Sequence, residues 1–104
     1  MIFIETHVFT KLLRDLMSDD EYTEFQQYLT NHPSAGDVIQ NTGGLRKIRW
    51  SARGKGKRGG VRVIYYYIAP DAQIRLLLIY QKGTQDNLTE EQKKLLRQLN
   101  ERWL

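Results

Sequence analysis

The stretch that decides the fold runs from residue 61 to residue 80 and reads VRVIYYYIAPDAQIRLLLIY. Its first part, Val61 to Ile68, is rich in β-branched and aromatic residues, which is typical of a strand. Ala69 to Gln73 contains Pro and Asp and predicts a hairpin turn, so Ile74 to Tyr80 is expected as the next strand. The continuous apolar run from Leu76 to Ile79 indicates a central strand that is covered on both faces.

Helical patterns precede this hairpin. Apolar residues recur at helical spacing from Phe9 to Met17, and Thr6 can cap the start of that helix. The sequence Ser18-Asp19-Asp20-Glu21 is a capping box, so a second helix is expected to begin there and to end before Pro33. Almost no residues separate the two helices, and we therefore expect a helical hairpin.

Two further strands and a last helix complete the order. Ile2 to Ile4 is expected as the first strand, residues 34–44 as a loop, and Leu45 to Ser51 as the next strand. Thr89-Glu90-Glu91-Gln92 is a second capping box, and it opens a C-terminal helix with apolar positions from Leu95 to Trp103. The sequence thus predicts the order β-α-α-β-β-β-α, an α+β domain with a small, mostly antiparallel sheet. We expect the helices on one face of this sheet and the cations on its other face or its edge.

Composition excludes several classes of protein. With 104 residues the chain is expected to form one domain, residues 1–104. An apolar fraction of 40% and an aromatic fraction of 11% exclude an intrinsically disordered chain, and the absence of Cys excludes a disulfide scaffold, a thiol nucleophile and a Cys-based zinc site. There is no apolar run near the roughly 20 residues that span a bilayer, and the N-terminal residues do not resemble a signal peptide. We therefore expect a cytoplasmic protein without a membrane partner.

The positive charges are concentrated in one interval. The chain has sixteen Lys and Arg against twelve Asp and Glu, a net charge of +4, yet no acidic residue lies between Asp37 and Asp71. That interval holds eight of the cations, so the remainder carries eight cations against twelve anions, a balance of −4. Such a concentration of positive charge favours a polyanionic partner, although a solvated surface loop is the simpler alternative. The cations in question are Arg46, Lys47, Arg49, Arg53, Lys55, Lys57, Arg58 and Arg62.

Alternation along the strands sorts these cations by face. Arg62 shares a face with Tyr66, whereas Lys47 and Arg49 lie on the face opposite to Arg46. We expect a cleft with Arg62 on its floor, and such a cleft would hold several phosphates. The residues expected on its rim are Lys55, Lys57 and Arg58.

Three aromatic residues near these cations could stack on bases. Tyr66, Tyr80 and Trp50 are the candidates, and ordinary packing in the core or on the sheet is the competing interpretation of each.

The sequence gives no support for a metal site, a Walker-type phosphate-binding loop or catalysis by paired carboxylates. His7 and His32 have no partners at metal-ligand spacing, so no metal and no cofactor are expected. Residues 54–60 are rich in Gly and Lys but lack the spacing of a phosphate-binding loop of the Walker type. The acidic residues at the expected helix starts are explained by capping.

The groups left for catalysis are Lys, Arg and Tyr, and these suit phosphodiester chemistry on RNA. The ribose 2′-hydroxyl can attack its own phosphate once it is deprotonated, and Arg stabilises the charge that develops on phosphorus. Neighbouring cations lower the pKa of a Lys, so Lys55 or Lys57 could be the general base, with Tyr80 as a second candidate.

Three stretches of the sequence form recognisable motifs, which read GDVIQ at 36–40, TGGLRKIR at 42–49 and GKGKRGGVRVIYY at 54–66. Together they resemble the HigB branch of the RelE/ParE toxin superfamily. The resemblance extends over nearly the whole chain, and it implies a RelE-like fold, which agrees with the expected element order.

The resemblance also implies a function. It implies the toxin of a type II toxin–antitoxin system, a ribosome-dependent endoribonuclease that cleaves mRNA in the A site of the 30S subunit, close to the ribosomal RNA, and so inhibits translation. It implies as a partner a helix-turn-helix antitoxin similar to HigA, whose complex with the toxin binds operator DNA.

The resemblance assigns roles to particular residues. Lys55 and Lys57 match the lysines of the family's basic loop, and Arg62 matches its strand arginine, while Arg58 is an additional phosphate contact. Tyr80 and Lys82 are the nearest matches to the family's distal residues. No Arg lies between Arg75 and Arg97, where some RelE-like members have a second phosphate-binding arginine. The RNA-binding residues expected around the catalytic set are Arg46, Lys47, Arg49, Arg53, Arg58 and Lys82.

Two alternatives remain open at this point. One is a ParE-like inhibitor of gyrase without nuclease activity, and the other is a nucleic-acid-binding module whose basic loop only positions phosphates. The set of Lys55, Lys57, Arg58 and Arg62 favours the endonuclease over the gyrase inhibitor, because an inhibitor of a protein needs no phosphate cleft.

Overall fold

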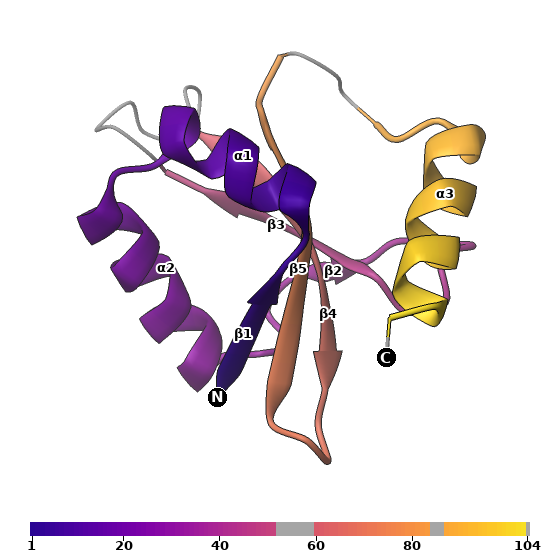
Figure 1. The fold of residues 1–104 in the computed structure, drawn as a ribbon, viewed down its shortest axis with the longest axis horizontal. Coiled ribbons are helices and arrows are strands. Elements are labelled where there is room, and N and C mark those ends of the chain that lie inside the picture. The colour runs from indigo at the N-terminus through magenta and orange to yellow at the C-terminus, as the bar shows by residue number, and fades with distance from the viewer. Residues whose placement is uncertain (52–59, 84–86, 104) are drawn as a thin grey trace.

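The fold is built on one mixed sheet with helices on both sides (Figure 1). The computed structural model describes residues 1–51, 60–83 and 87–103. The strand order is β1-β5-β4-β3-β2, with β1 parallel to β5 and the other neighbouring strands antiparallel. In chain order the elements are β1 (Ile2–Glu5), α1 (His7–Leu16), α2 (Asp19–Asn31), β2 (Asp37–Val38), β3 (Arg46–Trp50), β4 (Val61–Ile68), β5 (Gln73–Gln81) and α3 (Glu90–Glu101).

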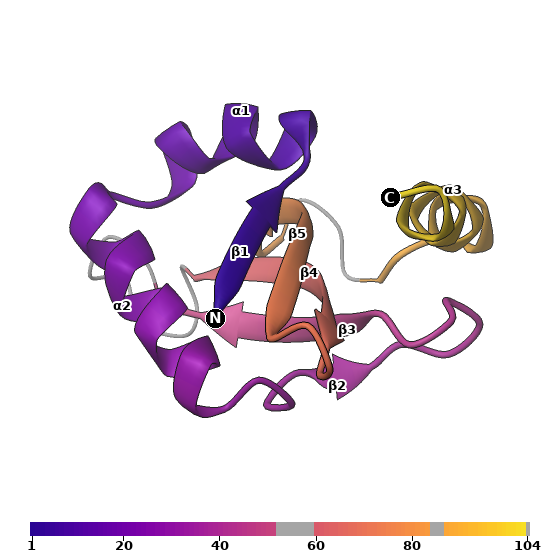
Figure 2. The same cartoon turned by 60° about the horizontal axis from the view of Figure 1, so that its bottom comes forward.

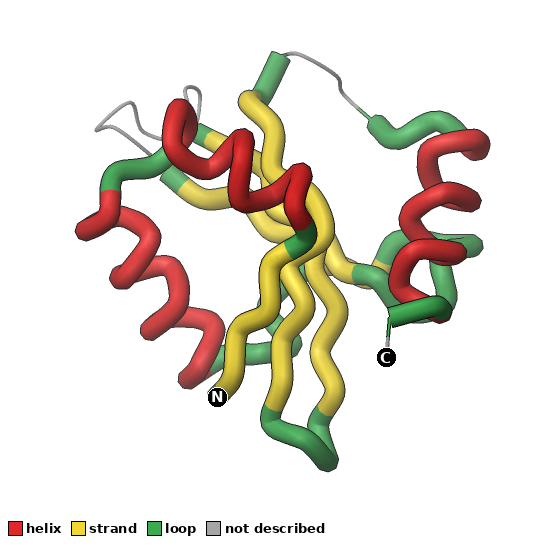
Figure 3. Tube along the Cα trace, viewed as in Figure 1, coloured by secondary structure: helices red, strands yellow, loops and turns green. Residues whose placement is uncertain are grey.

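The hairpin of β4 and β5 lies in the interior of the sheet, as the sequence predicts, and Figure 3 shows it flanked by strands on either side. Ile64 pairs with Leu78, but Tyr65 pairs with Leu76, so Leu77 is an extra residue that forms a β-bulge. Leu76 therefore packs on one face of the sheet, and Leu77 packs on the other. Both are almost fully buried, which confirms a strand covered on two faces.

All three helices begin at the predicted caps. Thr6 accepts a hydrogen bond from the backbone N–H of Phe9, and capping boxes form at Ser18 and at Thr89. Only two residues separate α1 from α2, but the helices meet at a corner and do not lie against each other as a hairpin (Figures 1 and 2). The reason is that each helix packs its apolar stripe on the sheet or its edge, with Phe9 of α1 and Phe25 of α2 both in the same core.

The prediction that helices cover only one face of the sheet is wrong. Figure 2 shows α1 and α2 on one side of the sheet and α3 on the other. The larger core lies under α1 and α2, and a second core around Leu45, Ile64 and Leu77 lies under α3. Because β4 and β5 carry apolar residues on both faces, the second face also needs a helix to exclude water.

The expected loop of residues 34–44 contains a strand, β2, that the sequence does not predict. β2 consists of two exposed residues, which is too short to show alternation in the sequence. Its pairing with β3 closes one edge of the sheet. Within the described residues, the structure has no helix that is both long and apolar enough to cross a membrane.

Candidate anion-binding site

Three predicted site residues form a line across adjacent strands. Arg49 of β3 pairs in register with Arg62 of β4, and Arg62 pairs with Tyr80 of β5. Residues directly opposite each other on neighbouring strands present their side chains to the same face, which here is the face covered by α3. We call Arg49, Arg62 and Tyr80 the cationic row.

Arg62 is the central member of this row, and its side chain is almost entirely withdrawn from solvent. The residue is 9% exposed. Among the residues that the structure describes, its guanidinium makes one hydrogen bond, from Nη1 to the carbonyl oxygen of Val61 at a long 3.4 Å, and no ion pair. A buried cation without a carboxylate is costly, and it is stabilised when an anion binds.

Tyr80 provides a second unsatisfied group beside Arg62. Its hydroxyl is buried and has no hydrogen-bond partner in the described part of the chain. Burial raises the pKa of the Tyr80 hydroxyl, and the nearby charge of Arg62 lowers that pKa by a smaller amount. The phenol therefore keeps its proton at neutral pH and can donate a hydrogen bond to a bound oxygen.

Arg49 brings a second positive charge to the row. It is exposed, and it stands opposite another cation, an arrangement that destabilises a pair of strands. A phosphate accepts hydrogen bonds from guanidinium groups on several oxygens, so one bound phosphate would relieve this repulsion.

Two lysines lie near the row. Lys47 is on the same face of β3 as Arg49, but it stands opposite Ile64, two residue pairs away from the row. Lys82 follows β5 and is exposed, and its backbone N–H donates to the carbonyl oxygen of Gly60 at 3.1 Å. The other predicted cations, Arg53, Lys55, Lys57 and Arg58, lie outside the described residues.

Arg46 lies on the opposite face, as strand alternation predicts. Its Nη1 donates to the carbonyl oxygens of Ser34 at 3.1 Å and Gly36 at 2.7 Å. This guanidinium therefore ties the loop after α2 to β3, and it stands apart from the cationic row.

The three aromatic residues that were predicted to stack on bases lie in different parts of the structure. Trp50 packs edge-on against Phe25, with ring centroids 5.3 Å apart, and against Tyr28 at 5.3 Å, so its packing role is established. Tyr66 is half-buried at the other end of β4 from Arg62. Tyr80 is the candidate that lies in the cationic row.

What the sequence did not provide was the register. Alternation assigns Arg49 and Arg62 to faces of their own strands, but only the pairing of β3 with β4 shows that they stand opposite each other.

In the described ranges there is no group of three His, Cys, Asp or Glu side chains that could hold a metal ion. No protein-family model matches the chain.

Proposed function

We propose that the cationic row binds phosphate groups of RNA, and that the chain is a ribosome-dependent endoribonuclease that acts as the toxin of a type II toxin–antitoxin system. The observation that carries the proposal is Arg62, a buried guanidinium with no acidic partner among the described residues, next to an unpartnered hydroxyl on Tyr80. The resemblance of residues 36–66 to HigB-type toxins supports RNA as the phosphodiester.

The row suits a phosphodiester better than a carboxylate or a chloride ion. Arg62 and Arg49 come from neighbouring strands, so their guanidinium groups can bind different oxygens of one tetrahedral phosphate. Tyr80 can donate a third hydrogen bond from the other side of Arg62. Three donors around one group are the arrangement that stabilises the additional negative charge of a pentacoordinate phosphorus.

The proposed reaction is a transesterification within the RNA. The ribose 2′-oxygen forms a bond to phosphorus while its proton passes to a general base, for which Lys55 and Lys57 remain the candidates. The bond from phosphorus to the 5′-oxygen of the next nucleotide breaks, and that oxygen takes up a proton. Arg62 stabilises the charge on the phosphoryl oxygens. Burial raises the pKa of Tyr80, so its hydroxyl stays protonated, donates a hydrogen bond and does not act as the base.

The proposed partners follow from the same resemblance. They are mRNA in the A site of the ribosome, a HigA-like antitoxin that neutralises the toxin, and operator DNA that is bound only through the complex with the antitoxin.

Primer extension on a translated mRNA, with and without ribosomes, tests the proposal. We expect cuts at codon-spaced positions only when ribosomes are present. Because Arg62 is buried, its replacement by Ala would leave a cavity, so Arg62→Gln is the better variant. Removal of one charge-stabilising donor lowers the rate by about 100-fold or more.

Lys47→Gln is the matched control, because it removes one positive charge from the same face but outside the row. It should lower cleavage by about fivefold, as expected for loss of one peripheral phosphate contact. Equal cleavage by the wild type and Arg62→Gln would contradict the assigned role of the row. Blocked translation with intact mRNA would support a nucleic-acid-binding module without nuclease activity. Normal translation would favour a ParE-like inhibitor of gyrase.

A further inference from the structure

A second pocket lies on the α3 side of the sheet, at the opposite end of β4 from Arg62. Its volume is about 410 Å³. Tyr66 and Arg62 are four residues apart on the strand, which corresponds to roughly 13 Å. The core around Ile64 and Leu77, covered by α3, lies between the two sites. The residues of this pocket that matter below are Tyr66, Asp71, Arg75, Asn100, Glu101 and Trp103.

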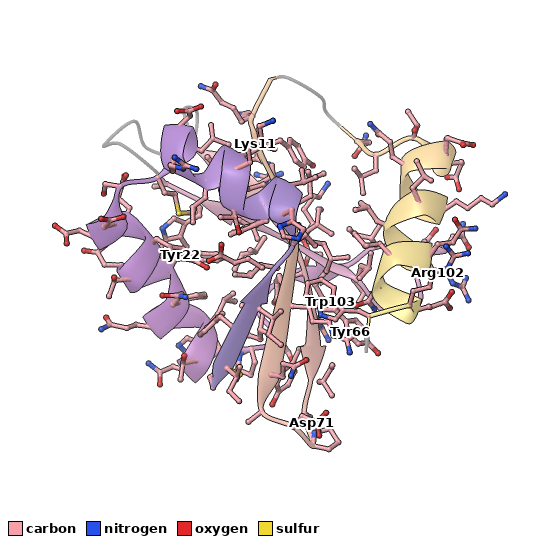
Figure 4. The ribbon with its side chains drawn as sticks, in the orientation of Figure 1. Lys11, Tyr22, Tyr66, Asp71, Arg102 and Trp103 are labelled. Carbon is pink, nitrogen blue, oxygen red and sulfur yellow. The ribbon has the colours of Figure 1, made fainter. Side chains whose placement is uncertain are left out.

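Two aromatic side chains from different elements line this pocket. Tyr66 comes from β4, and Trp103 follows α3 (Figure 4). The guanidinium carbon of Arg75 lies 5.4 Å from the centre of the Trp103 ring, so the ring is held in place by a cation–π contact. Flat, immobilised aromatic surfaces favour a flat ligand that can stack on them.

Arg75 supplies a fixed hydrogen-bond donor. Its Nη1 donates to the backbone oxygen of Asn100 at 2.9 Å and to Oδ1 of the same residue at 3.1 Å, and its Nε lies 3.4 Å from Oε1 of Gln73. Asn100 is 6% exposed, so this anchor is itself rigid. Within residues 1–51, 60–83 and 87–103, Arg75 has no carboxylate partner. Its hydrogen bonds there come from Nε and Nη1, so Nη2 can donate to a ligand.

The pocket also offers a carboxylate acceptor. Asp71 lies in the turn between β4 and β5, and it makes no hydrogen bond or ion pair with another described residue. The other carboxylate of the pocket, Glu101, already accepts from Nε of Arg97 at 3.2 Å. Asp71 is therefore the acceptor that remains available to a ligand.

We propose that this pocket binds a nucleobase, with a preference for guanine. A base provides the flat ring that Tyr66 and Trp103 can stack against. Guanine is the base that places two adjacent donors, N1–H and N2–H, on its Watson–Crick edge, and one carboxylate can accept both. Its O6 and N7 acceptors match the free donor of Arg75. The inference concerns a site separate from the cationic row and would extend RNA recognition beyond the phosphate backbone.

The two tryptophans of the chain make the test direct, because Trp103 lines this pocket and Trp50 directly follows Arg49 in β3. Trp103 reports on this pocket, and Trp50 lines a cavity with Arg49 of the cationic row. The experiment is a titration of the ¹⁵N-labelled full chain with guanosine monophosphate, followed by the two indole N–H signals. Inorganic phosphate is titrated separately, and each indole signal is assigned with a single Trp→Phe variant.

We expect guanosine monophosphate to shift the Trp103 signal to saturation, and inorganic phosphate to leave that signal in place. Asp71→Asn should weaken binding about tenfold, since the amide has only one acceptor oxygen for the two donors of the base. The matched control is Glu101→Gln, a carboxylate of the same pocket that is already engaged, and it should change the affinity by less than about twofold. The spectrum of each variant shows directly whether the fold is retained.

Several results would overturn the inference. If only the Trp50 signal moves, the nucleotide is bound beside Arg49 and not in this pocket. If the four ribonucleoside monophosphates bind with equal affinity, Asp71 does not read the base. If N-acetylarginine amide shifts Trp103 and the nucleotide does not, the pocket takes a cationic side chain. None of these results depends on RNA cleavage, so failure of this inference and failure of the proposed function are separable.

Discussion

Replacement of Tyr65 by Phe removes one oxygen atom from the centre of the protein. The side chain of Tyr65 is fully buried under α1 and α2. Its hydroxyl donates to the carbonyl oxygen of Pro33 at 2.9 Å and accepts from the backbone N–H of Gly36 at 2.9 Å. This one group therefore fastens the loop after α2 to the middle of the sheet.

The cost of the substitution can be worked from these two contacts. The Gly36 N–H lies in a buried hydrogen bond, and a buried donor without a partner costs about 1–3 kcal/mol. The lost bond to Pro33 is partly exposed and adds about 1 kcal/mol. The expected decrease in the free energy of unfolding is thus about 2–4 kcal/mol, a large share of the roughly 5–15 kcal/mol of a typical domain.

The assay is equilibrium unfolding in urea, with Tyr67→Phe as the control. Tyr67 lies on the same strand and packs against the same core, but its hydroxyl has no hydrogen-bond partner among the described residues. Its loss should change the free energy of unfolding by less than about 0.5 kcal/mol. If Tyr65→Phe falls within about 0.5 kcal/mol of Tyr67→Phe, the two hydrogen bonds do not contribute as argued.

Three further predictions concern the same framework. Gly36→Ala would place a Cβ 2.8 Å from Cε1 of Tyr65 and 3.0 Å from a backbone oxygen of β3, so unfolding measurements should show a loss of about 1–3 kcal/mol. Ser18→Ala removes the capping box of α2, and hydrogen exchange in the first turn should report a loss of about 1 kcal/mol. Burial raises the pKa of Tyr22, Tyr65 and Tyr80 above the ordinary value of 10.0, with a hydrogen bond to a carboxylate adding to the shift at Tyr22. The folded chain then holds protons that the unfolded chain releases. The free energy of unfolding should therefore fall as pH rises above about 10, by up to about 1.4 kcal/mol per pH unit for each tyrosine, as urea denaturation at several pH values would measure.

Local patterns in the sequence were sufficient to predict every helix and every strand except β2. The capping boxes at Ser18 and Thr89 involve residues three positions apart, so their geometry is decided within one helical turn. The bounds of β4 agree with the predicted Val61 to Ile68, because β-branched and aromatic residues cluster there. β2 was missed since a pair of exposed residues carries no periodic pattern.

Only part of the candidate site could be predicted from local sequence patterns. Arg62 and Tyr80 could be selected from composition and strand position, and Arg49 could be assigned to a face. Their alignment into one row depends on the register of three strands. The pocket at Asp71 and Arg75 could not be found from the sequence, because its walls come from β4, β5, α3 and the loop before β3.

The sequence by itself determined the helix starts, the central hairpin and the division of charge, since each depends on neighbours within a few residues or on strand alternation. Tertiary structure alone decided that α3 covers the second face, that β1 runs parallel to β5, and that two arginines stand opposite each other. The physical reason is that these features arise from contacts between distant segments. Such contacts are set by bulges, turn lengths and the need to bury both faces of β4 and β5, and no local pattern of residues encodes them.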